Sequence, residues 1–209
     1  MSRGRFITFE GGEGAGKSTQ AALLAGSLRE HGHKVLLTRE PGGTAGAEAI
    51  RSLLLAPDND WNAEAEALLF AAARADHVAN AILPALAAGQ WVVCDRYLDS
   101  SRAYQGGALA DADIRSLHAF GSRGLLPDRT ILLLPDEQEA VARLILRDGD
   151  QSDRISSRPA DYHRAVADRF RAFAAAEPER FVIVDAAGTI SEVHTRILAE
   201  VTAMQGSTA

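Results

Sequence analysis

The sequence predicts an α/β fold built on a parallel sheet, and two observations support this. Short apolar runs recur along the 209 residues, and longer stretches with helical periodicity separate them. Strands joined by helices of this length pair in parallel through right-handed crossovers. We expect residues 1–209 to form a single domain, because a chain of about this size can bury one full core.

Five apolar runs are expected to form buried strands. Each run is short, is rich in β-branched, aromatic or leucine residues, and lacks the polar alternation of a half-exposed strand. In chain order the runs span residues 5–10, 34–39, 91–95, 129–134 and 181–185. Ligands bind beyond the carboxyl ends of the strands in such sheets. The residues that follow each run are therefore the first places to look for a site.

The stretches between these runs are amphipathic and are expected to form helices. They span residues 17–31, 44–55, 63–88, 111–121, 136–146, 160–176 and 190–204. Residues 147–159 break the pattern, because they are polar and rich in Arg, Asp and Ser. Composition alone favours a solvated loop there, and the alternative of a mobile lid depends on the motifs below.

Composition and charge exclude several classes of protein. Hydrophobic residues make up 46% and charged residues 24% of the chain, which is ordinary for a globular protein and excludes a disordered one. The net charge of −6 argues against a broad nucleic-acid-binding face. The lone Cys94 excludes an intramolecular disulfide and a CxxC metal site. With neither a signal peptide nor an apolar run long enough to span a membrane, we expect a cytoplasmic enzyme or switch.

A phosphate-binding loop follows the first expected strand. Its glycines allow successive backbone N–H groups to face one anion, and the next helix adds its positive end. The lysine would reach the β- and γ-phosphates of ATP, and the serine hydroxyl would bind Mg²⁺. The segment matches G-x-x-x-x-G-K-[ST] and comprises Gly11, Gly12, Glu13, Gly14, Ala15, Gly16, Lys17, Ser18 and Thr19.

Further residues fit phosphate chemistry by their positions. Asp95 ends the third apolar run, as the acidic residue of a Walker B strand does, and would hold Mg²⁺ through water. Arg39 and Arg96 come at or just after strand ends, where guanidinium groups could bind a second phosphate. Phe70 and Arg74 are four residues apart and so share a helix face, which suits stacking on a base and hydrogen bonding to its edge.

Four segments together resemble bacterial thymidylate kinases, in the order and at the spacing of that family. They are FEGGEGAGKST at 9–19, TREPGGT at 38–44, DRYLDSS at 95–101 and AYQGG at 103–107. The resemblance implies transfer of the ATP γ-phosphoryl group to dTMP, giving dTDP and ADP. It also implies a P-loop NTPase fold with a five-stranded parallel sheet flanked by helices, a short mobile lid at about residues 147–159, and a homodimer.

The resemblance assigns the base-binding residues. Phe70 would stack on thymine and Arg74 would hydrogen-bond to its edge. Ser101 and Gln105 would also contact the base.

It likewise assigns the residues around the sugar and the acceptor phosphate. Arg39 and Arg96 would hold the phosphate of dTMP, and Arg51 would line the same pocket. Glu13 would lie near the 3′-hydroxyl, and Tyr104 would crowd the 2′ position.

The family carries a catalytic arginine either in the phosphate-binding loop or in the lid. Gly14 occupies the loop position here, which implies the lid type. Arg147 is the first candidate and Arg154 the second. Lys17 and Arg96 complete the expected catalytic set.

Two other functions remain open from the residues alone. A kinase for another nucleoside monophosphate would share the phosphate-binding loop and differ in its base pocket. A GTP-dependent switch would share the loop too, but no Asn-Lys-x-Asp motif for guanine is present. The D-x-x-G pattern at 185–188 lies near the C-terminus, on the wrong strand for a switch.

Overall fold

Five strands form one parallel sheet in the computed structural model, which describes residues 3–135 and 154–206. The sheet order is β2-β3-β1-β4-β5, and every neighbouring pair is parallel. The strands are β1 (Phe6–Glu10), β2 (Val35–Arg39), β3 (Trp91–Asp95), β4 (Arg129–Leu134) and β5 (Phe181–Asp185). All five predicted strands are confirmed, with β1 and β2 each beginning one residue later than expected.

The expectation that all five strands are buried is wrong for β2 and β5. Both are edge strands, so each has a neighbour on one side only. Leu37 in β2 is 38% exposed and Ile183 in β5 is 54% exposed, whereas β1 is buried along its whole length. An apolar run in the sequence therefore predicts a strand but does not show whether that strand lies at the centre or at the edge of the sheet.

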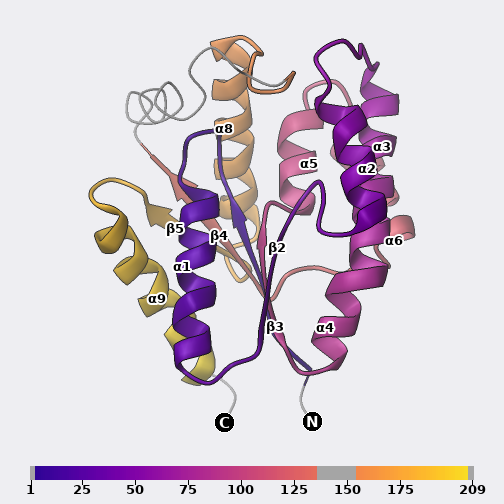
Figure 1. Cartoon of the computed structure of the whole chain (residues 1–209). Coiled ribbons are helices and arrows are strands. Elements are labelled where there is room, and N and C mark those ends of the chain that lie inside the picture. Colours follow the sequence, from indigo (N-terminus) through magenta and orange to yellow (C-terminus); the bar gives the residue numbers. More distant parts are fainter. Residues whose placement is uncertain (1–2, 136–153, 207–209) are drawn as a thin grey trace.

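Helices cover both faces of the sheet (Figure 1). On one face α1 packs against α9, and the other face carries the remaining helices. The bounds are α1 (Lys17–Glu30), α2 (Ala45–Leu55), α3 (Ala63–His77), η1 (Val78–Ile82), α4 (Leu83–Ala87), α5 (Leu98–Gln105), α6 (Asp111–Gly121), α8 (Ala160–Ala176) and α9 (Ile190–Gly206). The expected helix at 136–146 and residues 147–153 of the expected lid lie outside the described residues. Among the helices with described positions, none has the length and apolar character needed to cross a bilayer.

Successive residues of β1 point to opposite faces and build two separate cores. Ile7 and Phe9 pack with Leu24 of α1 and Ile197 of α9. Phe6 faces the other side and joins a cluster with η1 and α5. The sheet is thus fixed from both sides, which holds the carboxyl ends of its strands in place.

The stretch expected as a helix at 63–88 is helical from residue 63 to residue 87, but it forms three consecutive segments, α3, η1 and α4, in place of one regular helix. Asn62 caps α3 by accepting a hydrogen bond from the backbone N–H of Ala65 (2.8 Å). In η1 the backbone N–H of Leu83 bonds to the carbonyl of Val78, five residues back, as in a π-helix. Pro84 follows directly and cannot donate a backbone hydrogen bond. A proline in a helical pattern is therefore accommodated here by a widened turn rather than by a chain break.

The carboxyl ends of the central strands converge on one edge of the sheet. Asp95 of β3 lies opposite Phe9 of β1 on one side and opposite Arg39 of β2 on the other. The helix α5 begins three residues after Asp95 and was not expected from the sequence. Together these elements surround the loop between β1 and α1.

Candidate active site

The loop between β1 and α1 needs glycine at particular positions. Gly11 has φ 136°, and a Cβ atom there would lie 2.4 Å from the carbonyl oxygen of Leu133. Gly16 has φ 86° and precedes α1 without a side-chain cap on its first N–H groups. The backbone N–H groups at this helix start are therefore available to an anion.

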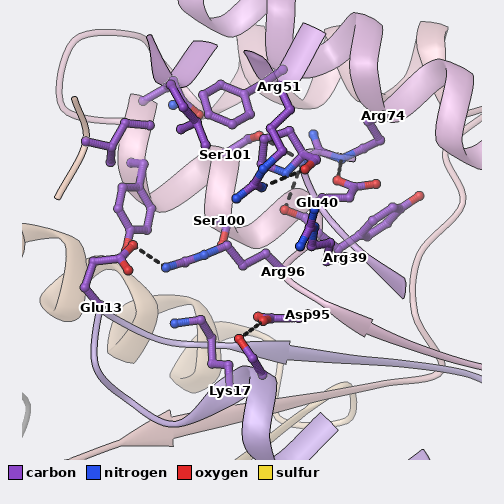
Figure 2. Close-up of a pocket in the computed structure, with 18 residues that line it drawn as sticks. Glu13, Lys17, Arg39, Glu40, Arg51, Arg74, Asp95, Arg96, Ser100 and Ser101 are labelled. Atoms are coloured by element: carbon purple, nitrogen blue, oxygen red, sulfur yellow. Dashed lines mark hydrogen bonds and ion pairs between the residues drawn. The ribbon is translucent and has the colours of Figure 1, made fainter. Parts of the chain in front are cut away.

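Lys17 and Asp95 lie close together beside this loop (Figure 2), and Ser18 is hydrogen-bonded to Asp95. The Lys17 Nζ donates a hydrogen bond to the carbonyl oxygen of Gly12 (2.6 Å). Burial and the nearby charge of Arg96 lower the pKa of Lys17 to about 8, although three carboxylates oppose that shift. The lysine that would bind phosphate thus sits in a site where its positive charge is poorly solvated.

The oxygen atoms of Ser18 and Asp95 fit a magnesium ion. The Ser18 hydroxyl donates a hydrogen bond to Asp95 Oδ2. The other carboxylate oxygen, Oδ1, is buried and has no hydrogen-bond partner in the described part of the chain. Mg²⁺ prefers such oxygen ligands and takes its others from water and phosphate. The described residues contain no cluster of three or more His, Cys, Asp or Glu side chains that could hold a metal ion.

Arg96 connects the phosphate-binding loop to α5. Its backbone φ of 70° is left-handed, which is unusual for a side chain other than glycine or asparagine. Its guanidinium donates to the carbonyl oxygen of Gly11 (3.2 Å), to the Ser100 hydroxyl (3.1 Å) and to the Glu13 carboxylate. This strained backbone turns the side chain from the end of β3 toward the loop.

A cavity of about 260 Å³ runs from this loop toward α3 and α5. Lys17, Ser18 and Asp95 line one part, and Phe70, Arg74 and Gln105 line another. Figure 2 shows Lys17 and Asp95 at one side of the site and Arg51, Arg74 and Ser101 at the opposite side. One cavity therefore joins the residues predicted for phosphate transfer to those predicted for base binding.

Arg74 is held rigidly by buried partners. Its Nε donates to Glu40 Oε2 (2.7 Å), and its Nη2 donates to Ser101 Oγ (3.0 Å) and to the carbonyl oxygen of Tyr97 (3.0 Å). Both Arg74 and Glu40 are almost completely buried. A guanidinium fixed in this way can present its remaining N–H groups in one direction only.

The other predicted arginines also line the cavity. Arg39 is more than half exposed and pairs loosely with Glu48 (3.3 Å). Arg51 reaches back to donate to the carbonyl oxygen of Pro41 (2.8 Å). Together with Arg96 they give one part of the cavity three guanidinium groups, a suitable environment for a second phosphate.

Glu13 and Tyr104 lie between the two parts. The Tyr104 hydroxyl donates to Glu13 Oε1 (3.1 Å), and the Arg96 guanidinium lies 5.0 Å from the centre of the Tyr104 ring. The tyrosine ring is thus packed against the same arginine that contacts the loop, where a sugar between base and phosphate would lie.

Of the two candidate lid arginines, only Arg154 belongs to the residues that the structure describes. Arg147 lies outside the described residues. Arg154 donates to the carbonyl oxygen of Leu54 (3.1 Å) and pairs with Glu66, and it is absent from the described lining of the cavity. Its neighbour Ile155 does line the cavity. The structure therefore brings the end of the predicted lid to the first cavity and places the Arg154 guanidinium against α2 and α3.

A second cavity, of about 510 Å³, borders the predicted phosphate-binding motif, and its opposite side was not predicted from the sequence. It lies between the phosphate-binding loop and the turn after β5, and its lining includes Gly14, Thr19, Gly188, Thr189 and Ile190. For the part of the lining that follows β5, the D-x-x-G pattern at 185–188 was the one sequence signal, because it marks a turn at a strand end.

Glu10 is a further buried group that sequence reasoning missed. Its carboxylate accepts hydrogen bonds from the backbone N–H groups of Tyr97 (2.8 Å) and Ser100 (3.1 Å) and from the Ser100 hydroxyl (2.6 Å). Burial, assisted by the charge of Asp99, raises the pKa of Glu10 to about 7. Glu10 thereby fixes the start of α5 against the end of β1.

Comparison with known proteins agrees with this geometry. A family model described as thymidylate kinase matches residues 9–197. A thymidylate kinase from Rhizorhabdus wittichii is 59% identical over 198 residues, covering 93% of this chain and 95% of the relative. One from Gluconobacter oxydans is 51% identical over 201 residues, covering 94% and 93%. A crystal structure of thymidylate kinase from Ehrlichia chaffeensis superposes with a TM-score of 0.76 at 31% identity, covering 96% of this chain and 99% of that one.

Proposed function

The chain belongs to the thymidylate kinase family, and we propose that its first cavity binds dTMP while the phosphate-binding loop and second cavity bind ATP. The enzyme phosphorylates dTMP to dTDP. The observation that carries the proposed binding mode is the continuity of the first cavity, which joins Lys17 to Phe70 and Arg74. A nucleoside monophosphate spanning it would present its phosphate to the loop that holds the donor.

The acceptor would be bound by groups along the whole cavity. Phe70 offers a face for stacking, and Arg74, Ser101 and Gln105 offer polar atoms to the base edge. Glu13 would contact the 3′-hydroxyl of the sugar, which it can do as a hydrogen-bond acceptor. The lack of a 2′-hydroxyl in dTMP suits the closely packed ring of Tyr104.

The acceptor phosphate would lie among Arg39, Arg51 and Arg96. Of these, Arg96 is the one whose guanidinium also touches the phosphate-binding loop, at Gly11. It is therefore placed to hold the acceptor oxygen in line with the transferred group. Phosphoryl transfer requires such positioning and charge stabilisation more than covalent chemistry.

The donor would be held by the loop of residues 11–19 and by Lys17, whose ammonium reaches the β- and γ-phosphates. The second cavity, beside Gly188 and Thr189, would take the remainder of ATP. Ser18 and Asp95 would hold Mg²⁺, which supplies positive charge to the phosphates when it is bound. The unpartnered Oδ1 atom of Asp95 supports this assignment.

Charge on the transferred phosphoryl group would be balanced by Lys17, Arg96 and a lid arginine. Arg147 remains the predicted lid arginine. Arg154 is proposed as a second, and its pairing with Glu66 indicates that this would require the end of the lid to move. In this proposal the chain is one kinase domain with a lid at about residues 147–159.

The proposal also includes a cytoplasmic homodimer. Cys94, the one cysteine of the chain, is free and buried, as expected where thiols stay reduced. Phe120 on α6 is 92% exposed and Leu68 on the neighbouring α3 is 56% exposed. Large apolar side chains left on adjacent helices favour a second copy as their partner.

The test is ADP release measured across a panel of dTMP, dUMP, dCMP and dGMP. We expect dTMP to have the highest kcat/KM. Lys17→Met removes the ammonium at similar length and should reduce kcat about 100-fold or more, with the thermal melting temperature retained as the folding control. A faster reaction with another monophosphate would contradict the substrate assignment, and near-normal turnover by the variant would contradict the role of the loop.

A further inference from the structure

Glu66 of α3 is a buried carboxylate that the proposed function leaves without a task. Only 3% of it is exposed, yet it does not belong to the described lining of the first cavity. Its Oε2 atom pairs with Arg154 and with the Nη2 of Arg158 (2.6 Å), both at the end of the lid. Its Oε1 atom accepts a hydrogen bond from the Nε2 of Gln105 (3.0 Å). The two oxygens of one carboxylate therefore serve two different neighbours.

This arrangement fixes the orientation of the Gln105 amide. An amide carries a donor at one end and an acceptor at the other, whereas an ionised carboxylate can only accept. Gln105 must therefore turn its nitrogen toward Glu66. Its oxygen, Oε1, is then buried with no partner among the described residues, on a side chain that lines the cavity. Such an acceptor is costly unless a ligand donates to it.

The imide of thymine supplies the matching donor. Thymine carries an N–H group at N3, uracil carries the same group, and cytosine has an acceptor nitrogen there. An acceptor of Gln105 facing this edge would bond to the imide and would oppose the lone pair of cytosine. A base that leaves a polar atom of the site without a hydrogen-bond partner binds less tightly, and this penalty discriminates against cytosine.

We propose that Glu66 is a positioning residue that holds the Gln105 oxygen toward the base and so sets the preference for imide bases over cytosine. This inference rests on the proposed binding of dTMP in the first cavity. Arg154 and Arg158 balance the buried charge of Glu66 at Oε2 and leave Oε1 to Gln105. The same contact ties α5 to α3 behind the base pocket.

The test is Glu66→Gln, which keeps the size and shape of the side chain. The oxygen of the new amide stays on the side of the two arginines, since these only donate. Its nitrogen then replaces Oε1 and faces Gln105, which must reverse its own amide to accept. A donor would now face N3 of the base. The ratio of kcat/KM for dTMP over dCMP should fall about 10-fold or more, while the ratio of dTMP over dUMP should not change.

Two controls separate orientation from a general structural effect. Arg158→Gln removes one charge from Oε2 and leaves Oε1 untouched, so the dTMP to dCMP ratio should stay as in the wild type. In a Gln105→Met background, Glu66→Gln should have no further effect on that ratio. If Glu66→Gln does not fold, Glu66→Leu takes its place. Glu66→Leu leaves the Gln105 amide free to rotate and should also lower the ratio of kcat/KM for dTMP over dCMP.

The inference is overturned if Glu66→Gln lowers kcat/KM equally for dTMP and dCMP, or if Arg158→Gln lowers the dTMP to dCMP ratio as much as Glu66→Gln does. It is also overturned if Glu66→Gln still lowers that ratio in the Gln105→Met background. Failure of the proposed function would look different, because the wild-type enzyme itself would then show no preference for dTMP in the same assay.

Discussion

Lys17 shows how a single residue in this site is adjusted by its surroundings. It is buried beside Arg96, and both effects disfavour its charged form. Glu13, Asp95 and Glu10 act in the opposite direction and leave the pKa at about 8. Near neutral pH most molecules therefore carry the ammonium group, and the free enzyme begins to lose it at mildly alkaline pH.

This pKa predicts a particular pH dependence of activity. In the proposed function the protonated lysine binds phosphate, so kcat/KM for ATP, which reports on the free enzyme, should fall as pH rises through about 8. Bound triphosphate adds negative charge that favours the ammonium, so kcat at saturating ATP should hold to higher pH. Steady-state profiles of both parameters check this, with the pKa of the ATP phosphates well below this range. A kcat/KM that stays level to about pH 9.5 would contradict it.

Site residues differ in how far the sequence could predict them. Gly11, Lys17 and Ser18 form a local motif, and Asp95 is identified by its place at a strand end. Glu40, Glu66 and Ser100 were missed. Glu40 and Glu66 contact Arg74 and Gln105, which lie 34 and 39 residues further along the chain, and Ser100 contacts Glu10, 90 residues before it. No local pattern marks such a partner, because only the folded chain brings the two side chains together.

At the scale of elements, α5 shows why the spacing of apolar residues in a sequence does not reveal every helix. Its sequence is LDSSRAYQ, with few apolar residues, yet seven of its eight residues are buried. It packs against α3, α6 and α8. Its polar side chains are satisfied by partners inside the protein, so their polarity does not indicate exposure. The proposed function accounts for this composition, since Ser101, Tyr104 and Gln105 all line the first cavity.

Asp99 connects α5 to the start of β5 through a network of buried charged side chains. It is fully buried and accepts hydrogen bonds from Arg102 (2.9 Å) and from both terminal nitrogens of Arg180 (2.5 and 2.9 Å). Arg180 lies directly before β5 and also donates to Glu177 and Thr130. Burial works to raise the pKa of Glu177, but Arg180 and Arg102 outweigh it and lower that pKa to about 2.

Arg180→Met should therefore destabilise the fold by about 3 kcal/mol, because it leaves Asp99 buried with one fewer cation. Urea unfolding measures the change in the free energy of unfolding. The matched control is Arg171→Met, which breaks an ion pair with Asp168 that is mostly exposed on both sides. That control should change stability by no more than about 0.5 kcal/mol. Equal effects from the two substitutions would show that the buried network does not stabilise α5.

For the whole molecule, the sequence predicted the class of fold but not the arrangement of its parts. Alternating apolar runs and helical stretches were enough to predict five parallel strands. Their order, β2-β3-β1-β4-β5, depends on which strands meet across long crossovers. The exposed residues Leu37 and Ile183 belong to runs that looked as buried as β1. Burial at an edge is a property of the assembled sheet, so a local run of residues does not encode it.

Assembly of two molecules is the prediction that belongs to this scale. Phe120 of α6 is 92% exposed and Leu68 of α3 is 56% exposed, and these two helices are in contact on the side of the molecule where Figure 1 shows α2, α3 and α6. In a twofold dimer each subunit contributes the same side chains, so the interface buries two copies of each. Burying one phenylalanine contributes about 1.5–3 kcal/mol, so two copies contribute about 3–6 kcal/mol.

Phe120→Asp should then weaken the dimer by about 10²- to 10⁴-fold in its dissociation constant. Light scattering at micromolar concentration should report a dimer mass for the wild type and a monomer mass for this variant. Leu23→Asp is the control, because Leu23 is 37% exposed on α1, which belongs to the opposite face of the sheet. It should leave the dimer intact. A monomeric wild type would refute the dimer, and a dimeric Phe120→Asp variant would place the interface on another surface.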